Sequence, residues 1–351
     1  MAFINGIGLI SPQNTLDPDV FLPAVVEHHA DYMKCVEPVF KEYIDPLLAR
    51  RMSRLIKTGI VSAKLCLRDA GCSLPDAIIT GTGLGSIEDT EKILGEITKE
   101  EKFLNPTPFI QSTYNTISSQ IAITLKCHGY NSTYVHRSFS FESGLQDAML
   151  QFEEGIAGNI LAGGIDEMTG NHLQITRRIG LWKMHPVHNL SVLKENTPGA
   201  LAGEGSGFFL LSSARNDHTY ATLKGVETIY KPSGTSELGS KVRTFLSGHG
   251  LTPGDMDVII TGINGDTRWD PLYNEVNALL FPSKPLAWYK HLSGEYHTAS
   301  TFALWMASNM IKRQVYPHIT MLNDFVPPVI RHVLIHNHFR GDNHSFILAG
   351  S

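Results

Sequence analysis

The sequence has 351 residues, of which 42% are hydrophobic and 18% are charged, and this composition excludes a disordered chain. The net charge is −5, and no cluster of lysine and arginine interleaves with aromatic residues, which argues against a nucleic-acid-binding surface. No stretch reaches the roughly 18 apolar residues that a membrane-spanning helix needs. The four cysteines have no metal-ligand spacing, so we expect buried thiols in a cytoplasmic protein with no metal and no cofactor.

The predicted elements alternate between strands and helices from the first residues onward. Short, β-branched apolar runs bounded by turns predict buried strands, and longer amphipathic runs predict helices. In chain order, strands are predicted in 1–10, 76–81, 159–166, 203–213, 257–262, 332–339 and 341–351, and helices in 52–74, 116–129, 237–254 and 297–313. This alternation indicates βα units around parallel-rich sheets.

Several of these elements occur twice in the same order. The run DAIITG at 76–81 returns as DVIITG at 257–262, and each copy follows an amphipathic helix and a glycine-containing turn. The pair NILAGGID and GEGSGFFLLSS is mirrored near the end of the chain by HVLIHNHF and GDNHSFILAGS. Ordered repeats of this kind predict a duplicated chain. We expect two halves, residues 1–215 and 216–351, each with the order βαβαβαββ.

The segments of this chain resemble those of the β-ketoacyl-acyl-carrier-protein synthases, or ketosynthases, over nearly its full length. The similar segments include INGIGLISP, RRMSR, IITGTGLGS, PTPFIQSTYN, SGLQDA, LAGGIDE and GEGSG, in that order. Eight single positions of the family pattern are also retained: Gly203, Glu204, Gly205, Lys290, Gly294, Phe339, Gly341 and Asn343. The resemblance implies the thiolase fold, an α/β architecture in which two βαβαβαββ halves form a five-layer αβαβα body.

The residues that the family uses for catalysis are replaced in this chain. Ketosynthases need a nucleophilic cysteine at a strand-to-helix elbow and two histidines that stabilise an enolate. By the resemblance, Phe141 stands at the cysteine position, and Gly262, or Asn264 with a shifted register, stands at the first histidine. Glu295 stands at the second histidine, five residues after Lys290. Leu304 replaces a supporting glutamate, so we expect no catalytic residue at any of these positions.

Neighbouring side chains offer few substitutes for the missing groups. Ser140 is the fallback nucleophile, but strand alternation would place it on the opposite side from Phe141. His297, if helical, would point about 200° away from Glu295. The remaining histidines near the end of the chain are expected in turns or at the surface: His336, His338 and His344.

The resemblance therefore implies a subunit of fatty-acid or polyketide biosynthesis that does not form carbon–carbon bonds by itself. The leading hypothesis is a partner of an active ketosynthase, similar in role to a chain-length factor and visited by acyl carrier protein. The family places its dimer contact in the segment that contains Phe109, Tyr114 and Asn115. Two alternatives stay open: an active synthase or acyltransferase with a non-standard nucleophile, and a homodimeric acyl-binding protein.

Overall fold

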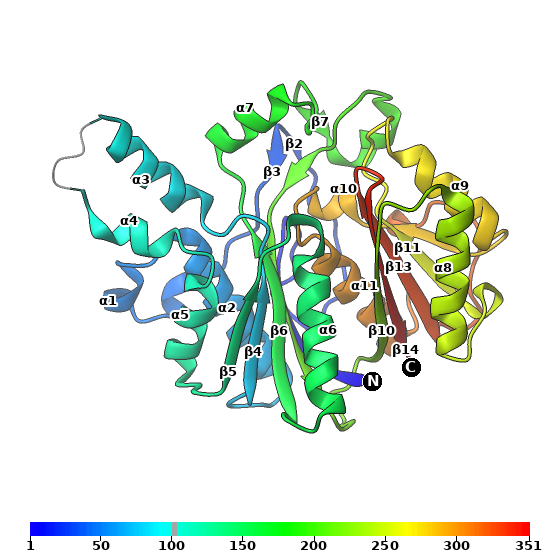
Figure 1. The fold of residues 1–351 in the computed structure, drawn as a ribbon, viewed down its shortest axis with the longest axis horizontal. Coiled ribbons are helices and arrows are strands. Elements are labelled where there is room, and N and C mark those ends of the chain that lie inside the picture. The colour runs from blue at the N-terminus through cyan, green and yellow to red at the C-terminus, as the bar shows by residue number, and fades with distance from the viewer. Residues whose placement is uncertain (100–103) are drawn as a thin grey trace.

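The computed structural model describes residues 1–99 and 104–351, and ten of the described strands form one sheet (Figure 1). The strands of the first half are β1 (Ala2–Ile10), β4 (Ala77–Gly81), β5 (Tyr130–Tyr134), β6 (Asn159–Asp166) and β9 (Gly205–Ser212). Those of the second half are β10 (Ala221–Tyr230), β11 (Val258–Thr261), β12 (Leu286–Trp288), β13 (His332–Phe339) and β14 (Asn343–Gly350). The sheet is continuous because β1 pairs with β10.

The two halves have the same strand order, which confirms the predicted duplication. The sheet runs β5-β4-β6-β9-β1 in the first half and β12-β11-β13-β14-β10 in the second. In both halves the second strand pairs in parallel with the third and the fourth, and the fifth strand is antiparallel to the fourth and the first. The repeated sequences lie on equivalent strands, DAIITG on β4 and DVIITG on β11. The division of the chain after residue 215, in the loop between β9 and β10, stays a prediction.

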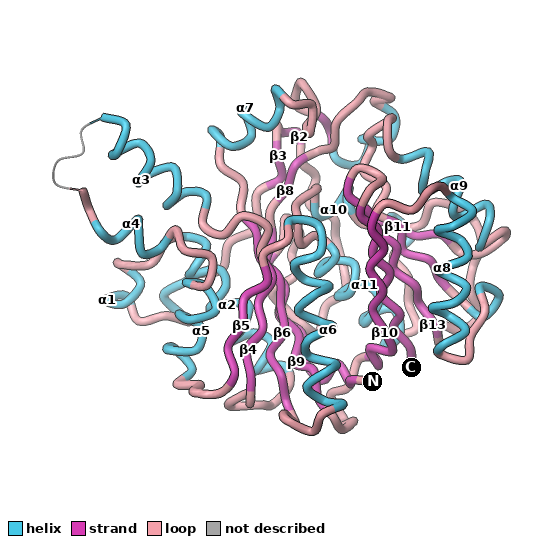
Figure 2. The backbone as a smooth tube through the Cα atoms, viewed as in Figure 1, coloured by secondary structure: helices cyan, strands magenta, loops and turns pink. Residues whose placement is uncertain are grey.

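The helices lie in three layers, one on each outer face of the body and one between the two half-sheets (Figure 2). The outer helices of the first half are α2 (Arg54–Asp69) and α5 (Thr116–Leu125), and those of the second half are α8 (Thr235–Gly248) and α9 (Asp270–Leu280). The central layer contains α6 (Ser140–Glu153) and α11 (Ser300–Arg313). Because α11 contacts strands of both halves, its residues from Ser300 to Ile311 are all buried. The layers are therefore αβαβα, as the resemblance implies.

Shorter elements surround the carboxyl ends of the parallel strands or project from the first half. They are β2 (His29–Ala30), β3 (Tyr32–Met33), α1 (Pro46–Ala49), α3 (Ile87–Lys99), α4 (Pro106–Gln111), α7 (Gly170–Arg178), β7 (Val187–His188), β8 (Ala202–Gly203) and α10 (Lys290–Ser293). Strand β2 pairs with β7, and β3 pairs with β8, in two small sheets. The described elements also include five short 3₁₀ helices, at residues 40–42, 137–139, 189–194, 253–255 and 318–320. No helix in the described part of the chain is long and apolar enough to cross a membrane.

The predicted burial of the thiols is mostly confirmed. All four cysteines are free, and Cys35, Cys66 and Cys127 are buried, whereas Cys72 is only half-buried. Burial raises the pKa of the Cys35 and Cys66 thiols well above the usual value, and the carboxylate of Glu204 raises that of Cys35 further. Neither thiol lies at the elbow near Phe141, so the buried cysteines are core residues.

Candidate functional site

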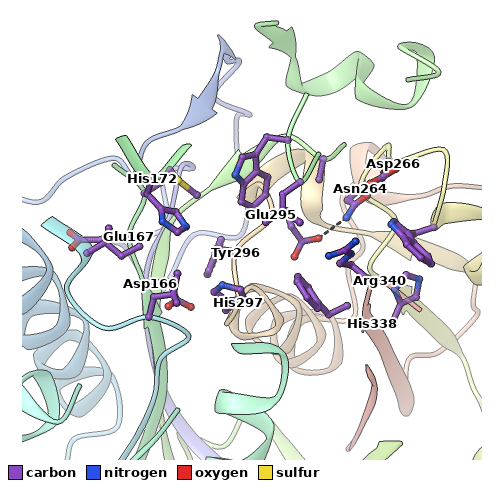
Figure 3. A pocket seen from close by; sticks show the side chains of 18 of the residues that line it. Asp166, Glu167, His172, Asn264, Asp266, Glu295, Tyr296, His297, His338 and Arg340 are labelled. Atoms are coloured by element: carbon purple, nitrogen blue, oxygen red, sulfur yellow. Dashed lines mark hydrogen bonds between the residues drawn. The ribbon is translucent and has the colours of Figure 1, made fainter. Parts of the chain in front are cut away.

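A pocket opens at the carboxyl ends of β4, β6, β11 and β13, where α/β proteins commonly bind their ligands (Figure 3). We call it the Glu295 pocket, and its cavity volume is about 60 Å³. Its polar lining comprises Asp166, Glu167, His172, Asn264, Asp266, Arg268, Glu295, Tyr296, His297, His338 and Arg340. Its apolar lining comprises Leu84, Ile87, Met168, Leu181, Trp182, Ala200, Trp269 and Phe339. The pocket therefore combines aromatic walls with a few convergent charged groups, as small-molecule sites do.

The expected elbow lies at the start of α6, and Phe141 is a core residue there. Its side chain is 1% exposed and belongs to the same buried cluster as Ile79 and Leu145. Its ring lies 5.7 Å from that of Phe209, centroid to centroid. Phe141 does not line the Glu295 pocket. At this position the chain presents a phenyl ring to the core and no nucleophile to the pocket.

The structure corrects the expected geometry around Ser140. The chain is already helical at Ser140, so Ser140 and Phe141 are successive residues of a helical turn and strand alternation does not apply. The hydroxyl of Ser140 donates to the carbonyl oxygen of Thr82 at 2.9 Å and accepts from the backbone N–H of His136 at 2.9 Å. It is fully buried, and no basic side chain receives its proton. Ser140 therefore fixes the start of α6 in this structure.

Gly262 stands in a place that no larger residue fits. A Cβ at this position would lie 2.4 Å from the hydroxyl oxygen of Tyr273 and 2.5 Å from Oδ1 of Asn337. Tyr273 is 1% exposed, and its hydroxyl donates to Asn337 and accepts from the backbone N–H of His338. The phenol of Tyr273 thus occupies the space next to Gly262 that a histidine side chain would need.

Glu295 and Asn264 meet at the floor of the pocket. The Nδ2 group of Asn264 donates to Oε2 of Glu295 at 2.6 Å, and the ammonium of Lys290 forms an ion pair with the same oxygen (Figure 3). The side chain of Lys290 is 1% exposed and that of Glu295 is 15% exposed. Burial of this kind is tolerated because the two charges neutralise each other. A carboxylate that is neutralised by Lys290 therefore faces the pocket.

The expectation for His297 is wrong, because the segment that contains it is not helical. Helix α11 begins only at Ser300, so His297 and Glu295 project into the same pocket (Figure 3). Desolvation lowers the pKa of His297 to about 4, although the charge of Glu295 opposes this shift. The imidazole is therefore neutral at physiological pH. Leu304 lies in α11 and is fully buried, so no carboxylate stands there.

Two carboxyl groups at the end of β6 form the other side of the pocket. Asp166 accepts hydrogen bonds from Thr82, Gly83 and both the N–H and the hydroxyl of Thr298, at 2.7–3.2 Å. Glu167 accepts from the backbone N–H of Glu88 at 3.0 Å. Desolvation raises the pKa of Asp166 to about 6 and that of Glu167 to about 7. Both groups join the loop after β4 to the end of β6, and Asp166 also holds the start of α11.

The prediction that three histidines near the end of the chain lie in turns or at the surface is wrong. His336 and His344 are fully buried on β13 and β14, and their Nε2 and Nδ1 atoms lie 3.1 Å apart. The ring of His338 stacks on Tyr273 with centroids 4.0 Å apart. Desolvation lowers the pKa of all three, that of His344 to about 4. They are neutral core residues, and sequence reasoning missed them because polar residues at strand ends usually mark turns.

The retained family positions cluster around the segment 293–296. A Cβ on Gly203 would lie 2.2 Å from the carbonyl oxygen of Ser293, and one on Gly294 would lie 2.5 Å from Cα of Gly203, so both positions require glycine. Glu204 forms an ion pair with Arg54 of α2. Gly205 lies beside Tyr296, and Lys290 forms an ion pair with Glu295. The remaining three positions lie at the turn between β13 and β14: Phe339, Gly341 and Asn343.

Sequence reasoning missed two charged residues. Glu142, beside Phe141, is completely buried, and its Oε1 accepts a hydrogen bond from the hydroxyl of Ser345 at 3.0 Å. Its burial raises its pKa. Arg340 lines the Glu295 pocket from the β13–β14 turn. A charged residue inside the otherwise family-like HFRGDN run is the signal that could have pointed to Arg340.

The residues predicted for a subunit contact are all exposed. Phe109 on α4 is 62% exposed, Tyr114 is 48% exposed, and Asn115 is also exposed. Ile110, next to Phe109 on α4, is 60% exposed, and Ile123 on α5 is 68% exposed. Exposed apolar side chains of this kind are typical of an interaction surface. Within residues 1–99 and 104–351, no three histidine, cysteine, aspartate or glutamate side chains are grouped as a metal site.

Comparison with known proteins agrees with this fold. Residues 27–176, which include the elbow at Phe141, match the family described as beta-ketoacyl synthase, N-terminal domain. No curated protein matches the chain by sequence.

Solved structures align with nearly the entire chain. The ishigamide ketosynthase/chain length factor has a TM-score of 0.81 at 17% identity, covering 100% of this chain and 98% of that chain. A beta-ketoacyl synthase from Burkholderia phymatum STM815 has a TM-score of 0.79 at 14% identity, with 99% and 98% covered. The structure of a ketosynthase in complex with its chain length factor from Xenorhabdus doucetiae gives 0.78 at 14% identity, with 99% and 97% covered.

Residues 27–176 thus match a beta-ketoacyl synthase family, and the fold of the whole chain is similar to that of solved ketosynthase and ketosynthase/chain length factor structures.

Proposed function

We propose that this chain is a ketosynthase-like subunit that performs no condensation itself and pairs with an active ketosynthase, in the way of a chain length factor. The observation that carries the proposal is Phe141, a buried phenyl ring at the elbow where a condensing enzyme needs its nucleophile. A phenyl ring forms no thioester. The acyl group would therefore be held by the partner.

The groups that would stabilise an enolate are also missing from their expected places. Gly262 has no space for a side chain, and Glu295 is a carboxylate that forms an ion pair with Lys290. A carboxylate accepts hydrogen bonds and would repel a developing oxyanion, so it acts opposite to a donor histidine. These two positions support a structural or gating role.

The edge strand β5 supports pairing with another subunit. It ends the sheet, and Tyr130 and Asn131 on it are exposed. An unpaired strand edge beside exposed apolar side chains is a surface that proteins normally cover. Phe109, Tyr114 and Asn115 lie in the neighbouring segment and are the proposed interface residues. The partner would be an active ketosynthase, and acyl carrier protein would deliver the chain to the pair.

Intact-mass spectrometry tests the absence of chemistry. The purified chain is incubated with acyl-carrier-protein thioesters and malonyl thioester, and covalent adducts and released CO2 are measured. No acyl-sized mass increase and no CO2 are expected from folded protein. An adduct that disappears in Ser140→Ala would instead establish an enzyme with a serine nucleophile.

Co-expression with a ketosynthase tests the partner. A one-to-one complex on size exclusion, with a product chain length that changes when this subunit is omitted, is the expected result. A stable homodimer that carries bound lipid and forms no complex with the ketosynthase would favour the acyl-binding alternative over our proposal.

A further inference from the structure

Arg340 occupies a strained position at the mouth of the Glu295 pocket. It lies in the turn between β13 and β14, with φ at +54°, a left-handed conformation that disfavours side chains other than glycine. Its side chain lines the pocket near Glu295 and Asn264 (Figure 3). Strained positions of this kind concentrate at ligand sites, where the side chain is needed for binding.

The other charged groups of the pocket have partners within it. Glu295 pairs with Lys290, and Asp266 pairs with Arg268. Asp166 accepts four hydrogen bonds from neighbouring groups, so both of its carboxylate oxygens already have donors.

Among the described residues, neither Glu167 nor a histidine of the pocket pairs with Arg340. Glu167 points to the loop after β4, where it accepts from the N–H of Glu88. Desolvation lowers the pKa of both His172 and His297, so these rings are neutral.

Arg340 itself takes part in no ion pair among the described residues, and the carboxylate of Asp342, two residues later, is not joined to it. A guanidinium presents a planar fork of donors that matches a carboxylate or phosphate. Within the described part of the chain, Arg340 is thus a cation of the pocket that pairs with no carboxylate.

The remaining walls are apolar and aromatic. Trp182, Trp269 and Phe339 line the same cavity as Arg340. Trp182 is buried, and its indole N–H is already used by the hydroxyl of Thr176, so it offers the pocket only its ring. A ligand that fits these walls has an apolar or aromatic body and carries its charge at one end.

We infer that the Glu295 pocket binds a ligand with an apolar or aromatic body and a single anionic oxygen group, a carboxylate or a phosphate, and that the guanidinium of Arg340 binds this group. The inference rests on the proposed function in one respect, because a pocket without a nucleophile holds its ligand and does not convert it. The anion could be the carboxylate of a free acid or the phosphate of a thioester carrier arm, and both have the chemistry that Arg340 recognises.

Binding of three matched probes to the full chain tests this inference. The probes are 4-phenylbutyrate, 4-phenylbutyramide and 4-phenylbutyl phosphate, which share one body and differ in the head group. Titration calorimetry gives Kd, and the fluorescence of Trp182 and Trp269 reports occupation of this pocket. We expect at least one anionic probe to bind about tenfold or more tightly than the amide. The better of the two anions identifies the source of the natural head group.

Variants of Arg340 assign the effect to this side chain. In Arg340→Gln, Kd for the preferred anion should rise about tenfold or more and that for the amide should stay unchanged, whereas Arg340→Lys should retain part of the preference. Arg340→Gly places glycine at a position with positive φ, so the variant should unfold at a denaturant concentration no lower than that of wild type. It should also lose the preference for the anionic probe over the amide. The exposed Arg331→Gln at the other end of β13 is the control and should bind as wild type.

Three results would overturn the inference. The first is equal binding of anion and amide, and the second is an anion preference that survives in Arg340→Gln. The third is no binding of any probe at concentrations up to about 5 mM by folded protein. Failure of the proposed function has a different signature, a covalent adduct or CO2 in the mass-spectrometric assay, so the two can be told apart.

Discussion

At the scale of single residues, the proposed absence of condensation chemistry depends on a few positions. Gly262 and Phe141 show two different physical barriers. At Gly262 the neighbouring Tyr273 and Asn337 occupy the volume that a side chain would need. At Phe141 the side chain is part of the core, and its replacement by a small thiol would leave a cavity next to Phe209. Restoring a family residue at either position therefore perturbs the packing.

Gly262→Ala measures the first barrier. The added methyl group would lie within 2.4 Å of the Tyr273 hydroxyl, so we expect the free energy of unfolding to fall by about 1–3 kcal/mol. Chemical denaturation measures the change. Gly95→Ala in α3 is the matched control, because no atom lies within 4 Å of its Cβ position, and it should stabilise the protein by about 0.5–1 kcal/mol. Equal stability changes in the two variants would contradict the steric explanation.

Glu167 gives a prediction for pH dependence. Its folded pKa of about 7 lies above the usual value of 4.5, so its favourable contribution is complete below pH 4.5 and is lost as the pH rises through 7. In Glu167→Gln this loss of stability does not occur, because glutamine does not ionise. The free energy of unfolding of the variant minus that of wild type should therefore rise between pH 4.5 and pH 7, by up to roughly 3 kcal/mol, and level off above pH 7.

Denaturation series at several pH values measure this difference. The exposed Glu154→Gln serves as control, and its difference from wild type should show no such rise. A Glu167→Gln difference that is flat across the same pH range would show that Glu167 does not titrate in this window.

At the scale of elements, the most informative feature is the uncovered side of the first half. Strand β5 ends the sheet, and α4 and α5 beside it carry exposed Phe109, Ile110 and Ile123. The corresponding edge strand of the second half, β12, is buried at Ala287 and Trp288. Two elements that are equivalent by duplication thus differ in exposure. This asymmetry supports the proposal that a partner subunit contacts the first half.

Phe109→Glu tests that contact. A charge within an apolar surface disfavours burial of that surface. The dissociation constant of the complex with the partner ketosynthase should therefore rise at least about tenfold, without loss of the folded state. Sedimentation velocity measures association, and circular dichroism checks the fold. Val315→Glu, at a 53% exposed apolar residue after α11, is the control and should associate as wild type. Unchanged association in Phe109→Glu would place the contact elsewhere.

At the scale of the whole molecule, the two halves share one core. The largest buried cluster joins Ile4, Ile79 and Phe141 of the first half to Ile260 and Phe302 of the second. Helix α11 lies between the half-sheets, and the pairing of β1 with β10 makes the sheet continuous. Neither half can bury its inner face without the other. The duplicated units are therefore expected to fold together.

Separate expression of residues 1–215 and 216–351 tests this dependence. Each fragment alone should lack a cooperative unfolding transition, because the inner face of its half-sheet would be exposed. Co-expression of the two fragments should restore a complex with a single transition. A cooperative transition in either isolated fragment would show that the half is an independent domain, and thermal denaturation followed by circular dichroism distinguishes the outcomes.

Much of the fold could be predicted from the sequence because its signals are local. The β-branched runs AIITG and VIIT became the equivalent strands β4 and β11, and the amphipathic run after Ser53 became α2. The candidate site was less predictable. The conformation after Gly294 decided that His297 shares the pocket with Glu295, and the start of α6 decided the place of Ser140. Neither boundary has a strong local signal.

The sequence by itself determined the duplication, the thiolase-type order of elements and the identity of the residues at Phe141, Gly262 and Glu295. The duplication and the order of strands and helices follow from the periodicity that each segment carries by itself. The thiolase fold and the choice of these three positions follow from the resemblance to ketosynthases. Only the tertiary structure decided that Tyr273 fills the space beside Gly262 and that Lys290 neutralises Glu295. It also decided that Arg340 lines the pocket without an ion pair to any residue that the structure describes. These facts depend on distances between segments far apart in the chain, and such distances are set by packing of the whole core.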